Sequence, residues 1–206
     1  MDQRLSRRQL GALAAPLALA IAAGRGAGIA FAQDTETPIL APTPACGDAD
    51  DFAATEAQTE GPFFTPNSPE RMSLLEEGMP GTKLVVTGYV YSTDCTPVPG
   101  ALVDFWHCDD AGVYDNEGYT LRGHQFTDDS GRYELTTIMP GVYPGRTRHI
   151  HVKAQKPESA VLTTQLYFPD EPQNATDRIF DPSLVMDLSD AEDGDGKVGY
   201  FTFVLA

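Results

Sequence analysis

Two histidines and two tyrosines are the residues of this chain whose types and spacing could do metal chemistry. His149 and His151 are two residues apart in the run from 146 to 152, and Tyr143 and Tyr114 precede them. In a β-strand this spacing places both imidazoles on one face, roughly 6.6 Å apart along the backbone. A strongly Lewis-acidic cation can hold a phenol as phenolate, a hard anion that favours ferric over ferrous iron. An isolated His-x-His is more often a solvated or hydrogen-bonded pair, so the metal assignment depends on the two phenols.

The first 32 residues have the features of an export signal. A pair of arginines precedes an apolar, alanine-rich stretch from Gly11 to Ala23, and Ala30-Phe31-Ala32 offers a small-x-small cleavage site. This order predicts a twin-arginine signal peptide over residues 1–32 and a periplasmic or secreted protein. Arg25 interrupts the apolar run, which argues against a permanent transmembrane helix. Retention of the leader as an anchor stays open.

The charge balance excludes two classes of partner. The 206 residues include 30 acidic and 14 basic side chains, for a formal net charge of −16, and four of the arginines lie in the leader. So acidic a chain is not expected to bind nucleic acid, or a membrane once the leader is removed. Solubility outside the cytoplasm is a sufficient reason for the acidity itself.

The three cysteines, Cys46, Cys95 and Cys108, allow at most one intrachain disulfide. Cys95 is predicted to lie in the turn of a hairpin, and Cys108 beyond the far end of its second strand. Their Cα atoms would then be further apart than the roughly 7 Å that a disulfide tolerates. Cys46 is therefore favoured as the partner of one of them, and the sequence leaves the choice open.

Short β runs separated by turn residues fill the chain from Lys83 onward. The strands are expected at Leu84–Tyr91, Ala101–His107, Arg132–Thr137, His149–Gln155, Leu162–Phe168 and Val198–Leu205. The turns are expected at Cys95–Gly100, Asp128–Gly131 and Asp193–Gly196, the last of which lacks the glutamate and the flanking helices of a calcium loop. The pattern predicts an all-β protein, an antiparallel β-sandwich with long loops that carry the metal site.

The domain itself is predicted to cover residues 59–206. Residues 33–58 are rich in Pro, Ala, Thr and Asp and have little periodicity, which is typical of a flexible arm or linker. One short helix is expected at Pro69–Glu77, where Ser68 could cap the beginning and Gly78 the end.

Several motifs, taken in their order along the chain, resemble the intradiol ring-cleavage dioxygenases, the catechol and protocatechuate dioxygenase family. The motifs are Thr59-Glu-Gly-Pro-Phe-Phe64, the run from Cys95 to Trp106-His107, Gly112-Val-Tyr114-Asp115, Leu121-Arg-Gly123, Thr127-Asp128, Pro140-Gly-Val-Tyr143-Pro144, Arg146-Thr-Arg-His149-Ile-His151 and Leu162-Thr-Thr-Gln165. The resemblance covers roughly Thr59 to Leu205, and the joint order and spacing of the motifs make it specific.

This resemblance implies a non-haem Fe(3+) ion with four protein ligands. Tyr114 and His149 would be equatorial, and Tyr143 and His151 axial, with a hydroxide or water completing the coordination. The implied reaction cleaves a catechol-type diol with O2 between its two hydroxyl-bearing carbons, giving a cis,cis-muconate-type diacid. Tyr143 would also accept one proton of the diol, which gives it a catalytic role besides its role as a ligand.

Two further residues match catalytic positions of the family. Arg146 matches the arginine that faces the substrate, where a permanently charged guanidinium stabilises anionic character on the ring. Gln165 matches a position on the oxygen side of the pocket. Strand alternation alone leaves Gln165 either inward or solvated, and the resemblance turns it inward. Trp106 is interpreted as core and His107 as a supporting hydrogen-bond residue.

Two other functions stay open at this point. One is a non-catalytic exported β-sandwich that binds carbohydrate or another protein. The other is a copper or zinc protein that uses His149 and His151 alone and lacks the red-brown colour of iron(III) tyrosinate. The sequence does not decide which catechol is preferred or whether the protein is a homo-oligomer.

Overall fold

The computed structural model describes residues 53–206. The predicted signal peptide at 1–32, the arm as far as residue 52, and Cys46 lie outside the described residues. Within the described part, no helix is long and apolar enough to cross a membrane.

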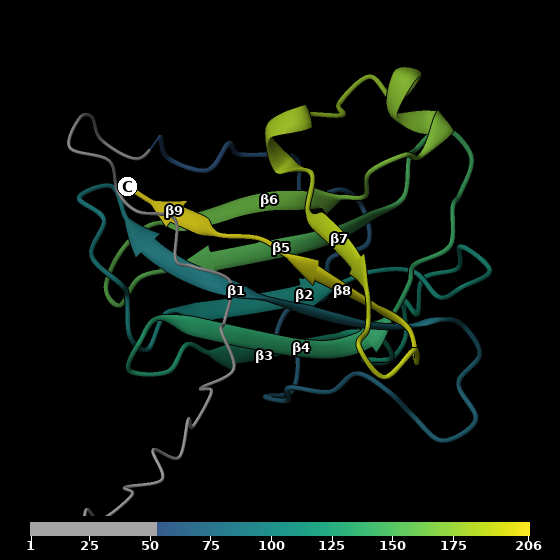
Figure 1. Cartoon of the computed structure of the whole chain (residues 1–206), viewed down its shortest axis with the longest axis horizontal. Coiled ribbons are helices and arrows are strands. Elements are labelled where there is room, and N and C mark those ends of the chain that lie inside the picture. The colour runs from purple at the N-terminus through teal and green to yellow at the C-terminus, as the bar shows by residue number, and fades with distance from the viewer. Residues whose placement is uncertain (1–52) are drawn as a thin grey trace, which may run out of the picture. The chain divides into compact units, whose positions relative to one another are not determined.

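The strands of residues 53–206 form two sheets. The first sheet has the order β4-β1-β8-β7, with β9 also paired to β1, and the second has the order β3-β2-β5-β6. The strands are β1 (Lys83–Ser92), β2 (Leu102–Trp106), β3 (Arg122–Phe126), β4 (Arg132–Ile138), β5 (His149–Gln155), β6 (Val161–Tyr167), β7 (Asp187–Asp190), β8 (Lys197–Tyr200) and β9 (Phe203–Leu205). Two short 3₁₀ helices, η1 (Pro172–Ala175) and η2 (Pro182–Leu184), lie between β6 and β7 (Figure 1).

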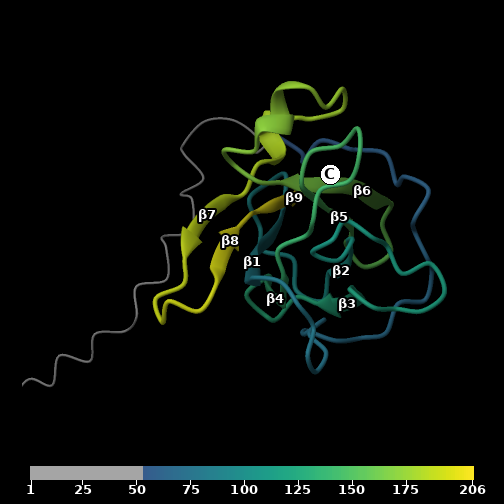
Figure 2. The same ribbon diagram turned by 90° about the vertical axis from the view of Figure 1, so that its right-hand side faces the viewer.

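The two sheets lie against each other as layers, and the core fills the space between them (Figure 2). Every second residue of β1 is buried, as expected for a strand with one face inward, and Leu84 and Val86 are fully buried. Ile150 and Val152 of β5 belong to the same buried cluster from the opposite sheet. The predicted all-β sandwich is confirmed, with the difference that β1 pairs with β8 and β9 in parallel.

One predicted strand and one predicted connection were wrong. The single strand expected at 198–205 is divided into β8 and β9, and between them Phe201 N–H donates to Thr87 O. The predicted hairpin across Cys95–Gly100 is a crossover, because β1 and β2 belong to different sheets. Cys95 is disulfide-bonded, and Cys108 is a buried free thiol.

The helix predicted at Pro69–Glu77 does not form. This segment pairs instead with the edges of both sheets: Arg71 N–H donates to His124 O on β3, and Leu74 N–H donates to Thr136 O on β4. Leu74 is fully buried in the core. The segment can reach both sheet edges because an extended chain covers more distance per residue than a helix. Backbone groups that a helix would pair internally are therefore satisfied by the sheet edges.

Two strands had no apolar signal in the sequence. β3 reads Arg-Gly-His-Gln-Phe and β7 reads Asp-Leu-Ser-Asp. β7 is an exposed edge strand, whereas β3 is buried partly by the segment at 69–77 that pairs with it. None of the residues of β7 is fully buried. The core-facing residues of β3 are Gly123 and Gln125, opposite Phe105 and Val103 of β2, so β3 shows no apolar alternation although one of its faces is covered.

Candidate metal centre

The outer face of the second sheet carries the two imidazoles. Since Ile150 and Val152 point into the core, His149 and His151 of β5 point the opposite way, and both are at most 2% exposed. The antiparallel pairing sets His151 opposite Gln165 on β6 and opposite Trp106 on β2. The Trp106 and His151 rings stack with centroids 4.8 Å apart and an interplanar angle of 7°. Strand register thus builds the floor of the site.

The protonation of the two imidazoles suits metal binding. Their Nε2 atoms lie 3.2 Å apart. His149 Nδ1–H donates to the carbonyl oxygen of Thr147 at 2.6 Å, so that its Nε2 carries the free lone pair. Burial, aided by the charge of Arg146, lowers the pKa of His149 to about 4, and burial lowers the pKa of His151 well below its usual value. Both side chains are therefore neutral at pH 7, the form that binds a cation.

The two tyrosines close a ring with the histidines. The ring centroids are 4.8 Å apart for His149 and His151, 6.2 Å for His151 and Tyr114, 5.8 Å for Tyr114 and Tyr143, and 5.6 Å for Tyr143 and His149. The four side chains predicted as ligands thus form a closed quadrilateral, although they come from one strand and two separate loops. We call this group the four-ring cluster.

The four-ring cluster has polar atoms that lack partners. The Tyr114 hydroxyl and His151 Nδ1 are buried without a hydrogen-bond partner among the described residues. Burial raises the pKa of Tyr114, and that of Tyr143, which keeps both phenols neutral. A buried, unpaired hydroxyl costs about 1–3 kcal/mol, and a Lewis-acidic cation removes that cost by binding the oxygen as phenolate.

The donor set fits a hard trivalent cation. No group of three or more His, Cys, Asp or Glu side chains within residues 53–206 is arranged to hold a metal ion. The phenols are the further donors beside the two imidazoles, and two phenolates with two neutral imidazoles suit iron(III) better than copper(I) or zinc.

Arg146 connects the four-ring cluster to the rest of the site. Its Nη1 lies 3.4 Å from both the Tyr143 hydroxyl and His149 Nε2. Its Nε donates to Asp177 Oδ2 at 2.8 Å, and its Nη2 donates to Gln165 Oε1 at 2.5 Å. The predicted residues Arg146 and Gln165 thus lie together, with Gln165 fully buried on the same outer face as His151.

Asp177 was not predicted from the sequence, yet it aims Arg146. Its carboxylate also accepts the N–H groups of Thr147, at 2.9 Å, and Ile179, at 3.1 Å. Burial alone would raise the pKa of Asp177, but these hydrogen bonds and Arg146 outweigh it and lower the pKa. Nothing in the local sequence singles out Asp177, because Arg146 and Thr147 lie about thirty residues upstream of it.

A segment before the first strand covers the site, and we call residues 59–64 the strap. Gln165 Nε2–H donates to Thr59 O at 2.9 Å, and Lys153 Nζ donates to Glu60 Oε2 at 2.5 Å. Phe63 stacks on Tyr114 with centroids 4.4 Å apart. A Cβ on Gly61 would lie 3.3 Å from His151 Cε1, a tight contact, and the φ of Gly61 is +71°, so both the space and the backbone conformation favour glycine here.

The two other histidines lie away from the four-ring cluster. His107 is buried, with Nδ1 bonded to Cys108 O at 2.7 Å and Nε2 to Thr137 Oγ1 at 2.8 Å. His124 Nδ1 lies 3.1 Å from Ser68 Oγ, which in turn donates to Asp104 at 2.8 Å. The ring nitrogens in these contacts are engaged by residues outside the four-ring cluster.

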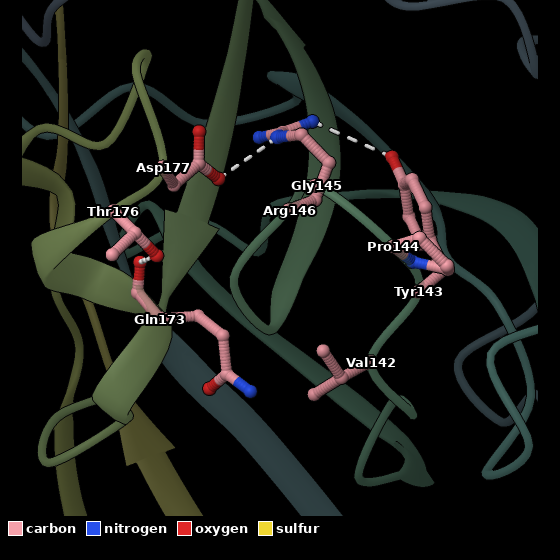
Figure 3. A pocket seen from close by; sticks show the side chains of 8 residues that line it. All are labelled: Val142, Tyr143, Pro144, Gly145, Arg146, Gln173, Thr176 and Asp177. Carbon is pink, nitrogen blue, oxygen red and sulfur yellow. Dashed lines mark hydrogen bonds and ion pairs between the residues drawn. The ribbon is translucent and has the colours of Figure 1, made fainter.

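A cavity of about 420 Å³ opens beside Tyr143 and Arg146. The residues that line it with them are Val142, Pro144, Gly145, Gln173, Thr176 and Asp177 (Figure 3). Gln173 Oε1 is buried without a hydrogen-bond partner among the described residues. The cavity is of the size that small-molecule sites have, and it adjoins the predicted metal ligand Tyr143.

Comparisons with known proteins place the chain in a family. A family model described as "Dioxygenase" matches residues 59–206. The catechol 1,2-dioxygenase of Candida albicans is 30% identical over 180 residues, which cover 71% of this chain and 59% of that protein. The chain therefore spans less than two thirds of the length of this curated relative.

Solved structures are similar over the same region. The dioxygenase domain of a dioxygenase carbohydrate-binding protein fusion from Streptomyces sp. SirexAA-E is 55% identical, with a TM-score of 0.72, and the match covers 74% of this chain and 97% of that one. The 3-chlorocatechol 1,2-dioxygenase from Rhodococcus opacus 1CP is 27% identical, with a TM-score of 0.68, over 73% of this chain and 71% of that one.

Proposed function

The chain belongs to the intradiol ring-cleavage dioxygenase family, and we propose on that basis that it is a non-haem iron(III) dioxygenase. Its substrate would be a catechol-type diol, cleaved with O2 between the two hydroxyl-bearing carbons to a cis,cis-muconate-type diacid. The observation that supports this most directly is the four-ring cluster, in which two neutral imidazoles and two phenols face one another in the interior.

In this proposal Tyr114, Tyr143, His149 and His151 hold the iron. When bound, iron(III) makes a coordinated diol acidic and activates its ring toward O2. Tyr143 is the ligand suited to take a diol proton, because it is only partly buried and lines the cavity, whereas Tyr114 is buried. Burial raises the pKa of Tyr143, so a proton on its oxygen is held as neutral phenol.

Arg146 would stabilise the negative charge that develops on the diol. A guanidinium stays protonated throughout, so it can stabilise an anion without donating its proton to it. Its direction is set by Asp177 on one side and by Gln165 on the other. Gln165 is itself held by Thr59 of the strap, so that its amide cannot turn without losing a buried hydrogen bond.

The cavity beside Tyr143 suggests an uncharged substrate larger than bare catechol. Among the described residues that line it, Arg146 is the one basic side chain, and in this proposal it already faces the diol. A carboxylate on the ring would find no free cation among those lining residues, in a chain with a net charge of −16. The unpartnered Gln173 Oε1 can instead accept a hydrogen bond from a neutral donor on the ring, such as a hydroxyl group.

Oxygen uptake by the iron-loaded protein on a panel of catechols, with identification of the products, tests the reaction. We expect a red-brown protein that yields muconate-type diacids. Semialdehyde products would indicate extradiol cleavage and contradict the assignment. A colourless protein that holds copper or zinc through His149 and His151 would support the simpler metal-binding alternative, and a coloured protein inert to every diol would support a binding module.

We also propose that the protein acts outside the cytoplasm. The twin arginines and the apolar stretch of residues 1–32 support this, since they have the order of an export signal. Fractionation of cells that express the full chain, with a variant in which Arg7 and Arg8 are both replaced by lysine as the control, tests the route. An unchanged distribution of the variant would refute twin-arginine export.

A further inference from the structure

Arg122 completes a row of side chains across the second sheet. It begins β3 and pairs in register with Trp106, which pairs with His151, which pairs with Gln165. Directly opposite residues of antiparallel strands share a face, so Arg122 lies on the same outer face as the candidate site. It is 2% exposed. An arginine is rarely buried unless its guanidinium has partners, so the partners of Arg122 explain its position.

The guanidinium of Arg122 holds two segments that both fix Tyr114. Its Nε and Nη2 donate to the carbonyl oxygen of Asp115 at 3.0 and 2.6 Å. Its Nη1 donates to the carbonyl oxygen of Phe63 at 2.6 Å. Asp115 follows Tyr114 in the chain, and the Phe63 ring stacks on the Tyr114 ring. Arg122 therefore holds Tyr114 in place in two ways: through the backbone next to Tyr114, and through Phe63, whose ring covers the Tyr114 ring.

Among the described residues, the guanidinium of Arg122 binds backbone carbonyl groups and no carboxylate. None of the ion pairs within residues 53–206 includes Arg122, and its hydrogen-bond acceptors are neutral carbonyl groups. The Asp115 carboxylate is engaged instead by the backbone N–H groups of residues 117, 118 and 120. The hydrogen bonds of the Arg122 guanidinium therefore hold the backbone at residues 63 and 115 in place.

We propose that Arg122 is a positioning residue for Tyr114, which it anchors from two sides. The role of Tyr114 as a ligand rests on the proposed iron site. The anchoring itself is independent of iron, since all three hydrogen bonds are made by the protein alone.

Two measurements separate the positioning of Tyr114 by Arg122 from a general contribution of Arg122 to stability. The first is the tyrosinate-to-iron(III) charge-transfer band, measured in a Tyr143→Phe background so that Tyr114 is the only tyrosinate ligand. The second is amide hydrogen exchange of residues 112–120 in the metal-free protein. The variants are Arg122→Met and Arg122→Lys, and the control is Arg132→Met, which removes a part-exposed arginine paired with Glu134.

We expect Arg122→Met to lose protection at 112–120 and to weaken or shift the band, with at least tenfold weaker iron binding. Arg122→Lys keeps the charge but cannot bond both carbonyl groups in the same way, so it should also lose protection at 112–120 and weaken or shift the band. Arg132→Met should change neither. Unchanged exchange and an unshifted band in Arg122→Met, or in Arg122→Lys if the first variant does not fold, would overturn the proposal. A colourless parent protein would refute the iron site itself, while the exchange measurement would still decide the anchoring.

Discussion

Replacement of Asp177 by asparagine should uncouple Arg146 from the candidate site while leaving the shape of the side chain nearly unchanged. The carboxylate accepts three hydrogen bonds, from Arg146 Nε and from the N–H groups of Thr147 and Ile179. Its side chain is 1% exposed, against 16% for Arg146. The substituted asparagine can keep one oxygen as an acceptor, but it places an amide N–H₂ against a second donor and leaves the guanidinium without its counter-ion.

The expected size of the effect follows from that burial. Breaking a buried ion pair by removing one charge costs about 3–5 kcal/mol. Because Arg146 retains some contact with solvent, we expect about 3 kcal/mol, or a fall in Tm of about 6–12 °C for a domain of this size. A reacting group displaced by about 1 Å costs on the order of 100-fold in rate, so kcat/KM should fall by about that factor.

The effect should depend on pH in a stated direction. The pKa of Asp177 is lowered in the folded state. A carboxyl group of this kind contributes stability that is fully present above its unfolded pKa of about 3.9 and is lost as the pH falls through the folded value. The difference in unfolding free energy between the parent and Asp177→Asn should therefore be constant near pH 7 and shrink below about pH 4.

Urea unfolding between pH 3 and 8, together with steady-state oxygen uptake, measures both effects. Glu171→Gln is the matched control, because Glu171 forms a similar pair with the neighbouring Arg148, at 2.6 Å, outside the four-ring cluster. It should lower stability without changing kcat/KM. Our reasoning on Asp177 would be falsified if Asp177→Asn matched the parent in both quantities, or if the difference in stability persisted unchanged at pH 3.

Three further predictions concern single sites. Tyr114→Phe should abolish iron binding or the red-brown colour, whereas Tyr143→Phe should keep iron and mainly slow substrate binding; equal visible spectra and kinetics for the two variants would contradict their separate roles. Gly61→Ala and Gly78→Ala both force alanine into a positive φ, costing about 1–2 kcal/mol each, but only the first meets His151, so only it should weaken iron binding when both are titrated. Gln173→Leu should weaken the binding of catechols with a further neutral donor on the ring, such as a third hydroxyl group, about tenfold and leave catechol itself unchanged, as measured by optical titration; equal losses for both ligands would refute its role.

The candidate ligands could be predicted from the sequence because their chemistry and spacing are local. His149 and His151 share a face of β5 by the two-residue period of a strand, whatever that strand pairs with. The motifs around Tyr114 and Tyr143 resembled a known family in order and spacing, and the structure brings both phenols to the two imidazoles. The strand at His149–Gln155 was predicted with its observed bounds, because apolar and polar residues alternate clearly along it.

The elements that were missed depend on partners distant in the chain. β3 has no apolar alternation, yet it pairs with β2. The segment at 69–77 has the capping residues of a helix, yet its backbone bonds to the edge strands β3 and β4. Sequence propensity is a weak signal where a sheet edge offers the backbone better partners. The positions of these two segments could therefore not be assigned without the sheets.

The sequence by itself determined the types of ligand, the face of β5 on which the imidazoles lie, and the β-sandwich class. Only the tertiary structure decided what surrounds them: Asp177 beside Arg146, the strap over His151, and Arg122 behind Tyr114. The reason is physical. Alternation along a strand follows from backbone geometry within a few residues, whereas strand register and loop docking are set by packing and hydrogen bonds between segments far apart in the chain.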